Sequence, residues 1–167
     1  MSQTADQGPA KASPVLWSEA RAAEIIAAHA DRPGALLPIL QALQAEFGWI
    51  SDEAAALAAE RLNLSRAEVH GALTFYHDFR RAPAGRHVLK LCRAEACQAR
   101  GGRQVEARTR AALGVGIGET TSDGAVTLEA VYCLGLCASG PAALLDERPV
   151  ARLAGERLER LLAEARA

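Results

Sequence analysis

The sequence has few aromatic residues, almost no net charge and no long hydrophobic run. Aromatic side chains make up 4% of its 167 residues, and the formal net charge is −1. A chain so close to neutral creates no field that would attract nucleic acid or an anionic membrane surface, so we expect neither as a partner. No segment approaches the roughly 20 consecutive apolar residues that a membrane-spanning helix needs, so we also expect no membrane contact by this chain.

The beginning of the chain lacks the features of a targeting signal. Residues 1–14, MSQTADQGPAKASP, contain no apolar run after a charged start, unlike a secretory signal peptide. Their polar composition, with glycine and proline, is typical of disorder, so we expect a disordered tail over residues 1–14. We therefore expect a cytoplasmic protein, in which cysteine thiols stay reduced and are used for metal or redox chemistry rather than disulfides.

Residues 15–80 carry the pattern of a helical bundle. A serine that can cap a helix precedes three of the segments, at Ser18, Ser51 and Ser65. Glu68 follows Ser65 with the spacing of a capping box. We therefore predict about four short helices, the last of them running to Phe79. In the helix without a capping serine, the apolar residues recur at the spacing of one helical face, and these are Leu36, Ile39, Leu40, Leu43 and Phe47.

The pattern changes to short strands and turns after a linker at 80–86 that contains proline and glycine. Two turn signals, Ser122-Asp123-Gly124 and Glu147-Arg148, each separate a pair of apolar segments and predict two hairpins. In order, we expect a strand over 87–92, a helix over 101–113, hairpin strands over 117–121, 125–133, 142–146 and 149–153, and a final helix. The sequence thus predicts an α/β protein, in which a helical N-terminal bundle is followed by a mixed-sheet domain over residues 87–167.

The four cysteines form two pairs, Cys92 with Cys97 and Cys133 with Cys137, each beside the end of a predicted strand. Their spacing is C-x4-C, then 35 intervening residues, then C-x3-C. Four thiolates in two neighbouring loops can bind an iron–sulfur cluster or a tetrahedral zinc ion. Structural zinc sites favour C-x2-C, whereas a 2Fe-2S cluster takes one thiolate pair for each iron. The spacing therefore favours a 2Fe-2S cluster, with zinc as the alternative.

Other uses of the cysteines fit the sequence less well. A thiol–disulfide enzyme would need C-x-x-C, and Rieske ligation would need histidine in each loop, and neither loop has them. Inert buried cysteines are the remaining alternative. The surroundings suit an anionic cluster, because small residues let backbone N–H groups approach and arginines add positive charge. These residues are Gly101, Gly102, Gly135, Ser139 and Gly140, with Arg93, Arg100 and Arg103.

Two segments, CRAEACQARGG and CLGLCASGPAALLD, resemble the thioredoxin-like 2Fe-2S ferredoxin family. The upstream segments LLPILQALQAEFGWIS and LNLSRAEVHGALTFYHDF resemble the helical N-terminal half of that family, so the resemblance covers roughly residues 34–164. It implies a thioredoxin-like fold for the mixed-sheet domain. It also implies that Cys92, Cys97, Cys133 and Cys137 bind the cluster, and that the chain has no catalytic residue of its own.

The resemblance implies an electron-transfer subunit that exchanges single electrons with an FMN- and iron–sulfur-containing diaphorase subunit that handles NAD. A larger catalytic subunit would complete the complex. The first loop, CRAEACQA, is most similar to the gamma subunit of NAD-dependent, molybdenum-containing formate dehydrogenase. The equivalent subunit of respiratory complex I (the 24 kDa type) or of an NAD-linked hydrogenase is the alternative, and a zinc-stabilised interaction module is the non-redox one.

Apolar residues in the helical half are candidates for contact with the diaphorase subunit. Ordinary core packing is the competing explanation for each of them. The candidates are Phe47, Trp49, Ile50, Phe75, Tyr76 and Phe79.

Overall fold

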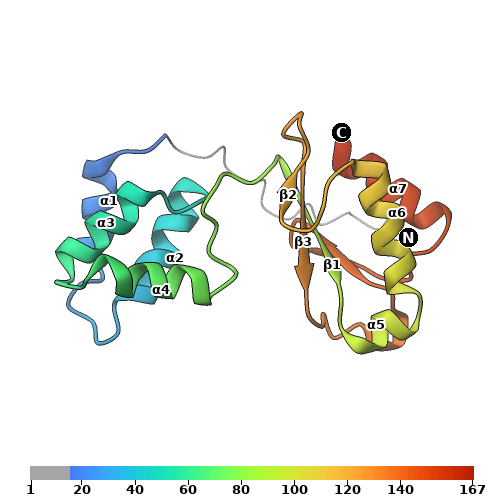
Figure 1. Ribbon diagram of the computed structural model, residues 1–167, viewed down its shortest axis with the longest axis horizontal. Helices are drawn as coiled ribbons and strands as arrows, with labels where there is room; N and C mark the ends of the chain where they lie inside the picture. The colour runs from blue at the N-terminus through green and yellow to red at the C-terminus, as the bar shows by residue number, and fades with distance from the viewer. Residues whose placement is uncertain (1–15) are drawn as a thin grey trace, which may run out of the picture. The chain divides into compact units, whose positions relative to one another are not determined.

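The computed structural model describes residues 16–167, which divide into two units, each with its own hydrophobic core. The first unit covers residues 16–83 and is helical, and the second covers residues 84–167 and contains the sheet (Figure 1). The tail expected over residues 1–14 lies outside the described residues. Within the described part of the chain, no helix is both long and apolar enough to cross a lipid bilayer.

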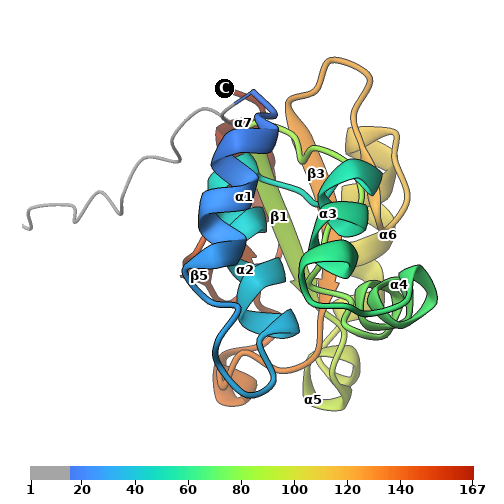
Figure 2. The same cartoon turned by 90° about the vertical axis from the view of Figure 1, so that its left-hand side faces the viewer.

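Residues 16–83 form four helices, α1 (Glu19–Ala27), α2 (Leu36–Phe47), α3 (Asp52–Arg61) and α4 (Arg66–Phe75) (Figure 2). The hydroxyls of Ser18, Ser51 and Ser65 each accept a hydrogen bond from the backbone N–H three residues later, so the three predicted caps are present. The predicted capping box is also present, because the Glu68 carboxylate accepts the N–H of Ser65 at 2.8 Å. The core of the unit includes Ile26, Ile39, Leu40, Leu43, Phe47, Ile50 and Val69.

Helix α4 ends at Phe75 and not at Phe79, where the sequence pattern ended it. The side chain of Gln44 in α2 explains the difference, because its amide group binds the backbone that follows α4. Its Nε2 donates to the carbonyl of Asp78 at 2.8 Å, and its Oε1 accepts the N–H of Arg80 at 2.6 Å. These two bonds hold the segment against α2 in a non-helical conformation, and no local sequence pattern encodes them.

The second unit is a five-stranded sheet with the strand order β2-β3-β1-β4-β5. The strands are β1 (His87–Cys92), β2 (Glu119–Thr120), β3 (Val126–Val131), β4 (Ala143–Leu145) and β5 (Arg148–Val150). Strands β1 and β3 are parallel, and the other neighbours are antiparallel, so the predicted mixed sheet is confirmed. The predicted strands were too long at both hairpins. In the first, β2 has only two residues and β3 stops before Cys133, and in the second, β4 and β5 have three residues each.

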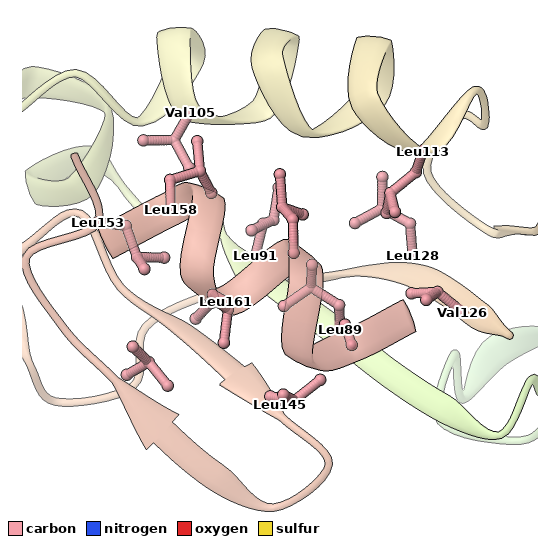
Figure 3. Packing of buried hydrophobic residues seen from close by; sticks show 14 of the residues in the cluster. Leu89, Leu91, Val105, Leu113, Val126, Leu128, Leu145, Leu153, Leu158 and Leu161 are labelled. Carbon is pink, nitrogen blue, oxygen red and sulfur yellow. The ribbon is translucent and has the colours of Figure 1, made fainter. Parts of the chain in front are cut away.

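Two helices, α6 (Gly102–Leu113) and α7 (Glu156–Arg166), pack on one face of this sheet. Because side chains alternate along a strand, Leu89 and Leu91 of β1 point to the same face. They are buried in one cluster with residues of both helices (Figure 3), which are Val105 and Leu113 of α6 and Leu158 and Leu161 of α7. This packing fixes β1 as the central strand and places its last residue, Cys92, at one end of the sheet.

The turn of the second hairpin lies one residue earlier than predicted, at Asp146–Glu147, because Arg148 already pairs with Leu145 in the sheet. Asp146 has a left-handed backbone, with φ of 47°. Its carboxylate accepts the N–H of Val88 at 2.9 Å and contacts His87 Nδ1 at 2.7 Å. These contacts with a strand distant in sequence set the turn position.

Thr109 of α6 carries a fully buried hydroxyl that has no hydrogen-bond partner among the described residues. A buried hydroxyl without a partner costs about 1–3 kcal/mol in lost hydration. The isosteric change Thr109→Val should therefore raise the free energy of unfolding by about 1 kcal/mol in a denaturant titration. A lower stability would contradict the assignment.

Thr127 provides the matched control, since it is also buried but its hydroxyl is bonded. Its Oγ1 accepts the N–H of Gly85 at 2.7 Å and lies 2.7 Å from the Thr120 hydroxyl. Thr127→Val should therefore lower the free energy of unfolding by about 1–3 kcal/mol, the opposite sign.

Candidate metal centre

Three chain segments meet at one end of the sheet and bring the cysteines there. Because β1 and β3 are parallel, their last residues, Cys92 and Val131, lie side by side. The N–H of Cys92 donates to the carbonyl of Ala142, just before β4, at 3.0 Å. The segment that carries Cys133 and Cys137 therefore starts and ends next to Cys92.

The first pair of thiols is buried. Cys92 is 5% exposed and Cys97 is 2% exposed, and both pack with Ala142. The sequence pattern predicted a loop here, but Cys97 lies in a short helix, α5 (Glu95–Ala99). The helix-forming residues of EACQA, followed by Gly101 and Gly102, were a signal that could have revealed it. Each of the two thiols shifts the pKa of the other, so α5 brings Cys97 back near the end of β1.

The second pair of thiols is exposed. Cys133 follows β3, and Cys137 begins a short 3₁₀ helix, η1 (Cys137–Ser139). Their Sγ atoms lie 3.7 Å apart. A disulfide would bring them to about 2.05 Å. Two sulfurs that bind the same tetrahedral metal ion, each at about 2.3 Å, lie about 3.8 Å apart. The observed spacing therefore suits two ligands of one ion.

The backbone of Cys133 has an unusual conformation that links the two pairs. Its φ of 77° lies in the left-handed region, which few residues other than glycine adopt. In this conformation the N–H groups of Cys133 and Leu134 both lie close enough to the sulfur of Cys92 to lower the pKa of its thiol. Successive N–H groups that converge in this way form a site for negative charge. No pattern in the sequence predicted this feature.

The surroundings shift the pKa values of the thiols in different directions. Burial raises the pKa of Cys92. Hydrogen bonding lowers that pKa by more than burial raises it, so the net shift is downward. The groups responsible are the N–H of Ala94, the thiol of Cys97 and the N–H groups of Cys133 and Leu134. Burial and the neighbouring Cys92 raise the pKa of Cys97.

The pKa of Cys137 is raised too, chiefly by the adjacent Cys133. Repulsion from Cys92 also raises it, so the two pairs influence each other electrostatically. Thiolates this close repel one another, and a cation among them would relieve that repulsion. The thiols are arranged as two pairs; among residues 16–167, no group of three or more His, Cys, Asp or Glu side chains surrounds a single ion position.

The glycines and arginines singled out in the sequence have distinct places. A Cβ atom on Gly140 would lie 3.2 Å from Cys97 Sγ, so the backbone there approaches the buried sulfur closely. Arg93 forms an ion pair with Glu106 of α6 at 3.0 Å. Arg100 donates from Nε to the carbonyl of Gly140 at 3.1 Å. The two cysteine segments are thus held together by backbone and side-chain bonds.

The chain matches a family model described as thioredoxin-like [2Fe-2S] ferredoxin over residues 22–166. This chain belongs to the thioredoxin-like [2Fe-2S] ferredoxin family. The resemblance found in the sequence is confirmed, and the cofactor of this ferredoxin is a 2Fe-2S cluster. Family membership decides against the zinc alternative. The ferredoxin is accordingly an electron-transfer protein.

Its relatives include the E subunit of NADH-quinone oxidoreductase from several bacteria. The relative from Pseudomonas aeruginosa is 35% identical over 119 residues, which cover 71% of this chain and 72% of the relative. The relative from Escherichia coli is 34% identical over 134 residues, or 80% of this chain and 81% of the relative. The relative from Mycobacterium tuberculosis is 37% identical over 128 residues, but the match spans only about half of that protein, 51%.

The fold is similar to part of the NAD+-reducing [NiFe]-hydrogenase in the air-oxidized state. The TM-score is 0.65 at 25% sequence identity, and the match covers 78% of this chain and 22% of the hydrogenase chain. The predicted fold, a helical N-terminal part followed by a thioredoxin-like mixed-sheet domain, is confirmed. Because the chain spans about a fifth of that protein, the similarity concerns the fold of this part alone.

Proposed function

We propose that Cys92, Cys97, Cys133 and Cys137 bind the 2Fe-2S cluster, with one thiol pair for each iron. The observation that carries this proposal is the pairing of the thiols at the end of the sheet, with Sγ atoms 3.7 Å apart in the exposed pair. When bound, the cluster takes up and gives back one electron at a time. The chain supplies four thiolates and N–H donors to it, and we assign no catalytic residue.

The two pairs serve different purposes in this proposal. Cys92 and Cys97 are buried and pack with Ala142, so they anchor the cluster on the protein side and exclude water there. Cys133 and Cys137 are exposed, and the neighbouring Tyr132 is 70% exposed. The partner's redox centre would therefore approach from the side of the second pair.

We propose that the partner is an FMN- and iron–sulfur-containing diaphorase subunit, in a cytoplasmic NAD-linked complex that also has a larger catalytic subunit. The similarity to the E subunit of NADH-quinone oxidoreductase and to part of an NAD+-reducing hydrogenase supports the NAD-linked class. Within this class, the sequence of the first cysteine segment, CRAEACQA, favours the soluble formate dehydrogenase type.

Analysis of the anaerobically purified protein with its bound partners tests these proposals together. We expect iron and sulfide in equal amounts, visible charge-transfer bands and an electron paramagnetic resonance signal after reduction. Mass spectrometry of the co-purifying subunits should identify the diaphorase, and formate should reduce NAD in the complex. A colourless chain would contradict the cluster proposal, whereas a hydrogenase or quinone-reducing complex would contradict only the formate dehydrogenase assignment.

The six apolar candidates for partner contact differ in burial. Phe47 and Ile50 are buried in the helical core, at 3% and 0% exposure, and Phe79 is partly buried against it. Trp49 is also partly buried. Phe75 and Tyr76, at the end of α4, are 72% and 44% exposed. Their rings form an edge-to-face pair with centroids 5.0 Å apart. We propose this exposed pair as the diaphorase contact, because exposed aromatic residues often dominate binding energy at interfaces.

Replacing Phe75 by alanine should weaken binding to the diaphorase subunit at least about thirtyfold, since truncation of a central interface residue costs about 2 kcal/mol or more. Because the ring is exposed, the melting temperature of the free chain should hardly change. Calorimetric titration of the purified partners gives both the affinity and the stoichiometry. Leu16→Ala is the control, since Leu16 is apolar and 90% exposed. Equal affinities for both variants would rule out the proposed contact.

A further inference from the structure

Arg100 connects the two cysteine-bearing segments through a single side chain. It follows α5 directly, three residues after Cys97. Its Nε donates to the carbonyl of Gly140 at 3.1 Å, in the segment that follows Cys137 and η1. The bond therefore joins the part of the chain that carries the buried pair to the part that carries the exposed pair.

The side chain of Arg100 also passes close to a buried sulfur. A Cβ atom placed on Gly140 would lie 3.2 Å from Cys97 Sγ and 3.5 Å from Arg100 Cδ, so both atoms lie close to the same point. Gly140 has no side chain at this point, and the arginine stem packs against the segment there. A larger residue at position 140 would separate the arginine from the sulfur.

Arg100 forms no ion pair with any acidic side chain among residues 16–167, and the carbonyl of Gly140 to which it donates is neutral. Arg93 differs, since it forms an ion pair with Glu106 at 3.0 Å. A guanidinium group remains protonated at any pH at which the protein is folded. Arg100 therefore brings a permanent positive charge to the junction of the two cysteine segments.

We propose that Arg100 is a positioning residue for the cluster and that its charge raises the cluster's reduction potential. This inference rests on the proposed cluster ligation by the four cysteines. Each electron that the reductant delivers adds one negative charge to the cluster, and no atom or proton need accompany it. A nearby positive charge stabilises the reduced form more than the oxidised form, so it raises the potential. The bond to Gly140 holds the segment after Cys137 in place beside Cys97.

The charge effect is tested by redox titration of the full-length, cluster-loaded chain, with dithionite as reductant and paramagnetic resonance as readout. Arg100→Gln should lower the ratio of reduced to oxidised cluster about tenfold at a given potential, which is a midpoint about 59 mV more negative for one electron. Arg100→Lys keeps the charge, so its midpoint should stay close to that of the wild type. Arg108→Gln is the matched control, since Arg108 is exposed like Arg100 but lies within α6 and outside the two cysteine segments.

The positioning effect is tested by the rate at which an iron chelator removes the oxidised cluster. Arg100→Met, which keeps the aliphatic stem but loses both the donor and the charge, should lose its cluster several-fold faster than the wild type and Arg108→Gln. Equal midpoints for Arg100→Gln and Arg108→Gln would overturn the charge effect. A tenfold change in the ratio of reduced to oxidised cluster in Arg100→Lys would overturn it as well. An unchanged chelation rate in Arg100→Met would overturn the positioning role. A wild-type chain without iron would instead overturn the cluster ligation itself.

Discussion

Replacing Cys97 by serine should leave the ferredoxin with less than about one tenth of its iron. The sulfur of Cys97 is buried, lies near Cys92 and is close to Gly140, so no other group can take its place. Serine offers a hydroxyl that is not ionised near neutral pH, whereas iron–sulfur clusters are held by thiolates. Iron and sulfide content and the visible absorption of the anaerobically purified variant measure the loss.

Serine variants of the other three cysteines test each proposed ligand separately. The chain has four cysteines in all, so no spare thiol can rescue the site. Serine at Cys92 should be as damaging as at Cys97, whereas serine at the exposed Cys133 or Cys137 should leave a cluster that forms but is lost faster. Ala99→Ser in α5 is the control, because it adds the same hydroxyl at an exposed position of the same helix. Any of the four variants with an unchanged spectrum and iron content removes that residue from the proposed ligand set.

The general layout of the site could be predicted from the sequence because its signals are local. Each cysteine pair spans only a few residues and lies at or just beyond the end of a strand that its own apolar pattern reveals. Once Cys92 and Val131 end two adjacent parallel strands, the two pairs must meet. The spacing of the thiols along the chain therefore carried information about their arrangement in space.

Other features of the site depend on contacts between residues distant in the sequence, so no local pattern predicts them. The bond from Arg100 to Gly140 crosses between the two cysteine segments, and the left-handed backbone of Cys133 follows from the path between β3 and η1. The position of the second hairpin turn depends on the contact of Asp146 with Val88. Sequence patterns reveal periodicity and caps, but they do not reveal which distant group will bind a free carbonyl or N–H.

In the helical unit, too, local patterns predicted some features, whereas others depend on contacts between distant residues. The apolar stripe of α2 correctly indicated a buried face that includes Leu43 and Phe47. The exposure of Phe75 and Tyr76 could not be predicted, because it depends on where α4 ends. That end is set by the side-chain amide of Gln44 and not by a stop signal within the segment.

Gly102→Ala should disturb the site without changing any proposed ligand. Gly102 begins α6, and a Cβ atom there would lie 2.7 Å from the carbonyl oxygen and 3.0 Å from the carbonyl carbon of Cys97. Backbone atoms cannot rotate away as a flexible side chain can, so α5 must move relative to α6. We expect a loss of about 1–3 kcal/mol in the free energy of unfolding, which is typical of overpacking. Because Cys97 lies in the displaced helix, its sulfur should move as well.

Gly71→Ala separates this steric effect from the general effect of replacing glycine. Gly71 lies within α4, is exposed, and a Cβ atom on it would meet nothing within 4 Å. Alanine should therefore stabilise that helix by about 0.5–1 kcal/mol. Denaturant titration gives the two stability changes, and the rate of cluster loss to a chelator should rise only in Gly102→Ala. If both variants lost the cluster at the wild-type rate, α5 would be able to shift without carrying Cys97 away from its partners, and the close packing at Gly102 would be irrelevant to cluster retention.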